Sequence, residues 1–365
     1  MVIRMFHLLS QNRKDITLVK SFHEQPALTF PSLAVGAASM AIMGLQDQAQ
    51  QDRLPYHAPH TLLLLNATLC SPAGIIALED GQILQDTLDH TMPEREGYTR
   101  TPEGKSVLPP SHVTLPGLWF SLLLGNSENI FHFLIMNLSR LCLLDEKDKR
   151  QLQGILLPAE LPVPMQEATK MALAATFGAA LPPLYRISKG ESVKVEKLLL
   201  GWNMLSHLEP SVRALLFLKD MAKPLPQPLP GKKLYIDRQE SAMRPLLNEG
   251  ELAKTLKTFG FECIKLEQLS FSEQIRHFAE ASLILAPHGA GNTHIVFCAP
   301  GTLLIEIMPD KLLNWCYRSM AELLGLRYDC IISRSLANSE IPPTFAPHQV
   351  AIIHVLGAIH HYLAL

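Results

Sequence analysis

The stretch FAEASLILAPHGAGNTHIVFCAPGTLLIEI, residues 278–307, decides the fold of the C-terminal part of the chain. Residues 282–286 and 302–307 are short runs of mostly apolar side chains, which are typical of strands buried on both faces of a parallel sheet. The residues between these runs predict a short helix over 293–298, followed by a Pro-Gly turn. The stretch therefore predicts one strand–helix–strand unit of an α/β protein.

A turn of small residues joins the first of these strands to the helix. Gly289 and Gly291 permit close approaches that a Cβ would block, and Asn292 is a favourable N-cap. Such a turn points backbone N–H groups outward, where the helix dipole adds partial positive charge, and His288 could donate to an anionic oxygen or act as an acid. The turn predicts a phosphate or diphosphate site, although a glycine-rich turn without a ligand explains the spacing equally well.

The composition describes a globular protein with a large core. The chain has 365 residues, 47% of them hydrophobic and 18% charged, and this length predicts two domains. The net charge of −2 gives no electrostatic reason to expect nucleic acid. The six cysteines form no Cys-x-x-Cys pair, which indicates a reducing compartment. The sequence shows no signal peptide and no apolar run long enough to span a bilayer, so we expect a cytoplasmic protein, with peripheral contact with the inner membrane left open.

A proline-rich segment divides the chain. Residues 223–232, KPLPQPLPGK, have proline at alternate positions and predict a stiff, extended linker. We therefore expect an N-terminal, acceptor-side α/β domain over 1–222 and a C-terminal α/β domain over 233–345. Residues 346–365 predict a closing helix that could pack back on the N-terminal domain. Two α/β domains joined by a short linker predict a cleft, which is a natural place for a ligand.

A second set of polar residues follows the linker. Arg238 ends the predicted strand 233–237, and Arg244, Asn248 and Glu249 lie in the loop after it. Two arginines at the carboxyl end of a strand could clamp a diphosphate through charge-assisted hydrogen bonds, the alternative being a solvated loop with a surface Arg–Glu pair. The chain contains no Asp-x-Asp pair, which would be typical of a metal site. We therefore expect arginine, histidine and backbone dipoles, and no metal ion, to stabilise the negative charge of a departing diphosphate.

Residues 126–144 predict a helix that carries His132 in its first turns. His132 lies between Phe131 and Phe133, and such a histidine is more often a hydrogen-bonded core residue than a catalyst. The segment by itself leaves both readings open.

Three segments taken together resemble the family 61 glycosyltransferases: NIFHFLIMNLSRL (129–141), YIDRQESAMRPLLNEGEL (235–252) and the stretch 278–307. That family includes plant xylosyltransferases and arabinosyltransferases, animal protein-linked N-acetylglucosaminyltransferases and bacterial polysaccharide enzymes. The resemblance covers roughly residues 60–332. It implies a GT-B-like α/β fold, in which two Rossmann-like domains face each other across a cleft. It also implies a metal-independent, inverting transfer of a sugar from a nucleotide-sugar donor.

The motifs of the family assign roles to individual residues. His132 is implied as the catalytic base, and Glu128 is the alternative because Met136 stands where the family often has an acid. Glu306 is implied to bind the ribose hydroxyls. The resemblance implies that the donor is bound by Arg238, Arg244, Asn248, Glu249, His288, Gly289, Ala290, Gly291, Asn292, Pro300, Gly301 and Glu306.

The resemblance also implies the partners. We expect no cofactor, a donor that is UDP-linked, and a glycan or lipid-linked acceptor in polysaccharide biosynthesis, such as that of a capsule. The main alternative, suggested by Met136, is a non-catalytic scaffold or glycan-binding partner of a polysaccharide assembly complex. A lesser alternative is another GT-B-like transferase with a different donor.

Overall fold

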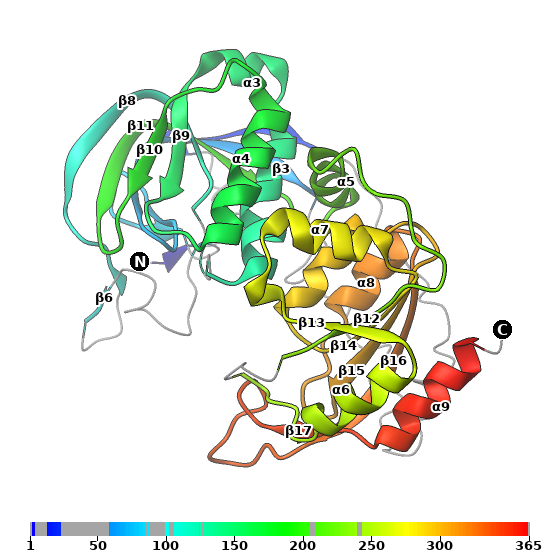
Figure 1. The fold of residues 1–365 in the computed structure, drawn as a ribbon. Coiled ribbons are helices and arrows are strands. Elements are labelled where there is room, and N and C mark those ends of the chain that lie inside the picture. Colours follow the sequence, from blue (N-terminus) through cyan, green and yellow to red (C-terminus); the bar gives the residue numbers. More distant parts are fainter. Residues whose placement is uncertain are drawn as a thin grey trace. The chain divides into compact units, whose positions relative to one another are not determined.

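The structure is a computed structural model that describes residues 2–3, 13–22, 58–84, 87, 99–101, 106–123, 125, 128–204, 209–238 and 243–363. The described chain divides between Met221 and Ala222 into two compact units. Each unit has its own sheet and its own hydrophobic core (Figure 1). The chain is therefore a mixed α/β protein, as the sequence predicts.

The first unit is built on a mixed sheet in the order β1-β5-β4-β3-β11-β8-β9-β10, with β2 also paired to β3. Its strands are Val2–Ile3 (β1), Ile16–Ser21 (β2), His60–Cys70 (β3), Ile75–Ala77 (β4), Ile83–Leu84 (β5), Ser111–Ser121 (β8), Leu152–Pro158 (β9), Leu184–Ile187 (β10) and Ser192–Trp202 (β11). Thr99–Arg100 (β6) and Ser106–Val107 (β7) form a separate pair. Alternate residues of β11, such as Val193 and Val195, enter the core because successive side chains of a strand point to opposite faces.

Helices cover the first unit beside this sheet. They are Glu146–Gln151 (α3), Val163–Phe177 (α4) and Val212–Met221 (α5), and α4 connects the parallel strands β9 and β10 (Figure 1). The helix expected over 126–144 is not a regular α-helix. It consists of a π-helix, His132–Asn137 (η3), and a 3-10 helix, Leu138–Leu143 (η4), and the Asn203 amide from outside the segment donates to the Ile135 carbonyl.

The second unit is built on a six-stranded sheet in the order β13-β12-β14-β15-β16-β17. Its strands are Lys233–Ile236 (β12), Phe261–Ile264 (β13), Leu283–Pro287 (β14), Leu303–Pro309 (β15), Arg327–Ser335 (β16) and His348–Gln349 (β17), of which only β17 is antiparallel to its neighbour. Every residue of β14 and β15 is buried, so the prediction of two buried strands is confirmed. The apolar runs have no polar alternation because both faces of this sheet are covered.

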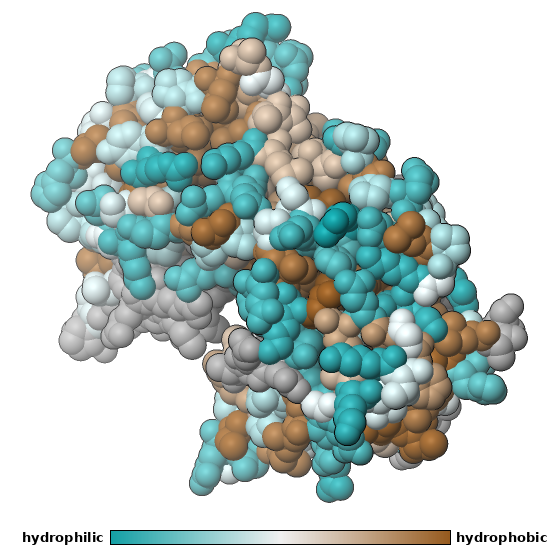
Figure 2. Space-filling view, viewed as in Figure 1, coloured by the Kyte–Doolittle hydropathy of each residue, from teal (hydrophilic) through white to brown (hydrophobic). Residues whose placement is uncertain are grey.

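The helices of the second unit lie on both sides of its sheet. They are Glu249–Thr258 (α6), Phe271–Glu280 (α7), Cys316–Leu323 (α8) and Ile352–Leu363 (α9), with 3-10 helices at Leu266–Gln268 (η5) and Ala290–Phe297 (η6). Figure 1 shows α6 and α9 on one side and α7 and α8 on the other. A capping box of Ser270 and Glu273 begins α7, whose outer face is hydrophilic (Figure 2). None of the described helices is long and apolar enough to cross a bilayer.

Helix α9 packs on the second unit's own sheet. Val355, Ala358 and Ile359 share a core cluster with Leu252 of α6 and Leu285 of β14. The apolar face of α9 is buried against the second sheet, beside α6. The expectation that residues 346–365 also pack back on the N-terminal domain stays a prediction.

Candidate functional site

The strand order of the second sheet creates a place for a ligand. The chain runs from β12 to β13 on one side and then returns to the other side of β12 to form β14. In open parallel sheets a ligand binds outside the carboxyl ends of the strands at such a switch in direction. Arg238 lies two residues after β12, and His288 follows β14 directly. The topology therefore brings to one edge two residues that are 50 positions apart in the sequence.

Arg238 lies directly against the glycine turn. Its Nη1 donates to the His288 carbonyl, and its backbone N–H donates to Glu249 Oε1 at 2.8 Å. A Cβ on Gly289 would lie 2.5 Å from the Cζ of Arg238. The φ of Gly289 is 175°, an extended value that any residue adopts. Glycine is needed here for the space that the guanidinium fills.

The turn itself presents backbone donors. Helix η6 begins at Ala290 with Gly289 as its cap, earlier than the helix expected over 293–298. The amides of Gly289, Ala290 and Gly291 donate to no acceptor within the described residues. Unpaired amides at a helix start attract an anion. Asn292 is not the N-cap that the sequence predicts, because it lies inside η6 and its buried amide donates to Pro287 O at 3.3 Å.

Glu306 is fully buried and serves other side chains. Its Oε1 lies 2.6 Å from His288 Nδ1, and its Oε2 accepts from the Tyr328 hydroxyl at 2.7 Å. The Asn292 amide also approaches Oε1, at 3.4 Å. Because a carboxylate accepts, His288 donates from Nδ1, which leaves its Nε2 for another partner. The sequence assigned Glu306 to ribose hydroxyls, whereas its carboxylate is already occupied by protein donors.

Arg244 adds a second cation at the same edge. It has a φ of 53°, an uncommon conformation for a residue with a side chain, and its Nη1 donates to Thr344 O at 3.1 Å. Its buried Nε has no partner in the described part of the chain. Burial, followed by the nearby charge of Arg238, lowers the pKa of Arg244 to about 10. Two partly buried guanidinium groups that repel each other favour an anion between or beside them.

Asn248 and Glu249 support this loop from behind. The Asn248 amide donates to Val350 O at 2.8 Å, and Glu249 accepts from the Tyr235 hydroxyl at 2.8 Å. Glu249 is buried, and burial raises the pKa of its carboxyl group. The sequence expected both residues to touch a donor, but their polar atoms face the protein instead.

Pro300 and Gly301 lie away from the glycine turn. They precede β15, and Gly301 N–H donates to Gly325 O at 2.8 Å. The turn thus lies at the amino ends of the strands, at the edge of the sheet opposite to His288. The sequence motif grouped these residues with the glycine turn because they are close in the chain, whereas a whole strand separates them in space.

The structure adds residues that sequence reasoning missed. The Tyr317 ring lies 5.5 Å from the His288 ring, centroid to centroid. Leu266, at the start of η5, packs on the turn, since a Cβ on Gly291 would lie 2.7 Å from its Cδ1. Beside it, Glu267 is exposed. Burial lowers the pKa of Arg238, and nearby groups oppose this change, among them the charge of Glu267. No local motif marks these residues, but Glu267 follows strand β13 by three positions, as ligand-binding acids at strand ends often do.

The predicted base lies in the first unit. His132 begins the π-helix η3 and is half-buried, with its Nδ1 3.0 Å from the Met136 sulfur and its ring edge-on to Phe131. Glu128 is exposed. The Met136 thioether therefore lies beside Nδ1 of the His132 ring, where an acidic side chain at position 136 would accept a hydrogen bond and orient the ring.

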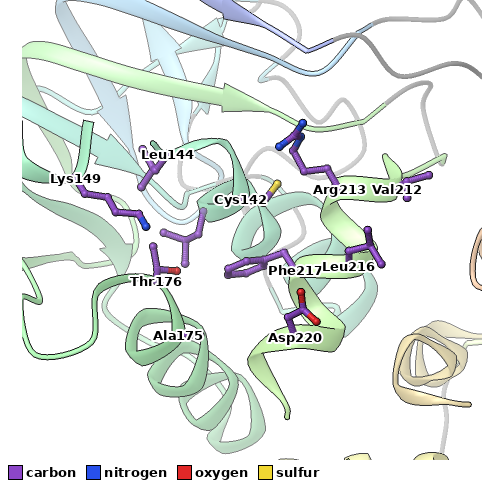
Figure 3. A pocket seen from close by; sticks show the side chains of 11 residues that line it. Cys142, Leu144, Lys149, Ala175, Thr176, Val212, Arg213, Leu216, Phe217 and Asp220 are labelled. Carbon is purple, nitrogen blue, oxygen red and sulfur yellow. The ribbon is translucent and has the colours of Figure 1, made fainter. Parts of the chain in front are cut away.

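An open groove of about 570 Å³ also lies in the first unit, among η4, α3, α4 and α5 (Figure 3). Apolar side chains such as Leu141 and Phe217 line it, with Lys149 and Asp220 among its polar side chains. None of the site residues predicted from the sequence lines this groove. Among the described residues, no group of three or more His, Cys, Asp or Glu side chains is arranged to hold a metal ion.

Comparisons with known proteins agree with the sequence motifs. Residues 130–305 match the model of the family described as Glycosyltransferase 61. The chain is 37% identical over 79 residues to a beta-1,2-xylosyltransferase of Arabidopsis thaliana, covering 22% of this chain and 14% of the relative. It is 33% identical over 103 residues to an alpha-1,3-arabinosyltransferase of Oryza sativa subsp. japonica, covering 26% and 17%. It is 31% identical over 107 residues to an EGF domain-specific O-linked N-acetylglucosamine transferase of Gallus gallus, covering 28% and 20%. The matched part thus spans at most a fifth of the length of these relatives.

Proposed function

The chain belongs to the Glycosyltransferase 61 family, and from this premise we propose that it is an enzyme that transfers a sugar from a nucleotide-sugar donor to a glycan acceptor. The observation that carries the proposal is the contact of the Arg238 guanidinium with the glycine turn at the switch point of the second sheet. This contact brings a cation and the three amides of the turn to the place where parallel sheets bind nucleotides.

In this proposal the second unit binds the donor. The amides of Gly289, Ala290 and Gly291 donate to the diphosphate, and Arg238 and Arg244 neutralise it. His288, held through Nδ1 by Glu306, turns its Nε2 toward the same oxygens. The acceptor hydroxyl attacks the anomeric carbon, the bond to the diphosphate breaks, and the electron pair leaves with the nucleotide. The guanidinium groups and the amides stabilise the negative charge that develops on the leaving diphosphate, and this scheme uses no metal ion.

We assign the ribose to Glu267 instead of Glu306. Glu306 is fully buried and its oxygens accept from His288 and Tyr328. Glu267 is exposed on the turn after β13, and it follows Leu266, whose side chain packs on Gly291. A carboxylate at the end of the second strand of such a sheet is well placed to accept from ribose hydroxyls.

The first unit would supply the acceptor side in a GT-B-like arrangement. His132 is the proposed base, with Glu128 as the alternative, and each would take the proton of the acceptor hydroxyl. We further propose a glycan or lipid-linked acceptor of polysaccharide biosynthesis, such as that of a capsule, and a UDP-linked donor. A cytoplasmic location, with or without peripheral contact with a membrane, fits these substrates.

A non-catalytic role is the second candidate, and one observation favours it. The Met136 sulfur lies 3.0 Å from His132 Nδ1, and a thioether is a weak acceptor that orients the ring less firmly than a carboxylate. A glycan-binding partner of a polysaccharide assembly complex would keep the donor site and dispense with the base.

The test is calorimetric titration with UDP, with and without EDTA, followed by a transfer assay with UDP-sugars and oligosaccharide acceptors. We expect UDP to bind equally well with EDTA and Arg238→Ala to weaken binding at least about tenfold, because a charge-assisted hydrogen bond is lost. Binding that needs a divalent ion would contradict the metal-free scheme. If the wild type transfers sugar and His132→Ala does not, the result supports the proposal that the protein is an enzyme with His132 as its base. If the wild type binds UDP but transfers no sugar, the result supports the non-catalytic role.

A further inference from the structure

The helix that carries His132 leaves α-helical geometry at a defined place. His132–Asn137 form the π-helix η3, and the Leu138 N–H that closes it donates to the carbonyls of both Leu134 and Phe133. A π turn holds one more residue than an α turn, is rare, and occurs frequently at functional sites. The first turns of this helix are therefore set by something other than local helix propensity.

Two buried side chains hold the carbonyl of Ile135 inside this segment. Ser139 Oγ donates to it at 2.5 Å, and Asn203 Nδ2 donates to it at 3.0 Å. Asn203 Nδ2 also donates to Ser139 Oγ. Asn203 and Ser139 are 1% and 0% exposed, so water does not compete for these bonds. Side-chain donors on a helical carbonyl loosen and bend the regular hydrogen-bond ladder.

Asn203 is fixed from outside the helix. It directly follows strand β11, and its carbonyl accepts from Ser211 N–H at 3.1 Å. Ser211 Oγ in turn accepts from Ala214 N–H in the first turn of α5, at 3.1 Å. Asn203 therefore connects the π turn to the end of a central strand and to the start of a packed helix, neither of which can shift freely.

We propose that Asn203 is a positioning residue that keeps the π turn in place and thereby aims His132. The catalytic half of this inference rests on the proposed function, in which His132 is the base. An α-helix turns by about 100° per residue, so loss of the extra residue of the π turn would rotate His132 by about that angle relative to η4. The hydrogen bonds of Asn203 and Ser139 to Ile135 O prevent this change of register.

A matched control exists in the same unit. Thr169 of α4 donates from Oγ1 to Met165 O at 2.7 Å and is 4% exposed. Thr169→Val removes one buried side-chain-to-carbonyl bond of the same kind, in a different helix. Asn203→Ala and Ser139→Ala remove the bonds to Ile135 O, Ser139→Ala being the milder change because Asn203 keeps its own bond.

Hydrogen exchange measured by mass spectrometry tests the structural half without any activity. In peptides that cover 132–143, we expect amide exchange about tenfold faster in Asn203→Ala, a smaller increase in Ser139→Ala, and wild-type exchange in Thr169→Val. Equal exchange in all four proteins would overturn the inference. If Asn203→Ala does not fold, Asn203→Leu, which removes the same donor and has a similar volume, replaces it with the same expected and refuting results.

Transfer kinetics test the catalytic half. Misplacement of a catalytic group by about 1 Å can cost about 10²-fold in rate, so we expect kcat to fall by about that factor in Asn203→Ala. The donor KM and the Kd for UDP should stay within about twofold, because the donor site is in the second unit. Thr169→Val should keep the wild-type kcat. A donor KM that rises together with the fall in kcat, or an unchanged kcat with faster exchange, would refute the positioning role. If the wild type transfers no sugar, the proposed function fails, and exchange still decides whether Asn203 holds the turn.

Discussion

Gly289→Ala is predicted to weaken nucleotide binding while leaving the fold intact. The backbone of Gly289 is extended, with a φ of 175°, so an alanine meets no backbone strain. Its new Cβ would lie 2.5 Å from the Cζ of Arg238, well inside van der Waals contact. The guanidinium is the free end of a long side chain, so it can move away at little cost to folding. It would then lose its place against the turn and its bond to the His288 carbonyl.

The expected size follows from the contact that is lost. A hydrogen bond to a charged group contributes about 1.5–3 kcal/mol. If the displaced Arg238 no longer reaches the diphosphate, the Kd for UDP rises about 10- to 150-fold. Removal of the whole side chain in Arg238→Ala should produce a similar loss, and the double variant should bind no worse than Arg238→Ala alone, because both changes act on one contact.

Calorimetry with UDP and urea unfolding of the same proteins check this prediction. Gly357→Ala is the matched control, since Gly357 lies in α9, has no positive φ, and a Cβ added to it would meet nothing within 4 Å. We expect this variant to bind UDP like the wild type. An unchanged Kd in Gly289→Ala would refute the assignment of Arg238 to the diphosphate. A large fall in the free energy of unfolding would show instead that the turn, and not the arginine, gives way.

Three further predictions concern the same unit. Tyr328→Phe leaves Oε2 of the fully buried Glu306 without its donor, so the free energy of unfolding in urea should fall by about 1–3 kcal/mol, and an unchanged value would contradict the bond. Glu267→Gln should reduce the preference for UDP over 2′-deoxy-UDP, about tenfold in the wild type, toward one; no preference in the wild type would remove the ribose role. Burial lowers the pKa of His294 to about 4 from 6.5, so the stability that neutral His294 contributes is complete above pH 6.5 and is lost as the pH falls toward 4. His294→Phe should flatten the fall in unfolding free energy over that range by up to about 3 kcal/mol, and an unaltered pH profile would count against it.

The sequence alone determined the elements whose signals are local. The apolar runs that became β14 and β15 are recognisable because strands covered on both faces need no polar alternation. The capping box of Ser270 and Glu273 is recognisable because its two bonds span three residues. The glycine turn was also predictable as a connection between a strand and a helix, since its small residues follow an apolar run.

Only the tertiary structure decided which polar groups remain available to a ligand. Arg238 meets Gly289 because the sheet places β12 beside β14, and Glu306 is taken by Tyr328 from the neighbouring strand. The Asn203 side chain donates to the carbonyl of Ile135, which lies 68 residues earlier in the chain, in the helix that carries His132. A buried polar atom must find a partner, and the identity of that partner depends on strand order and packing, which no short stretch of sequence contains.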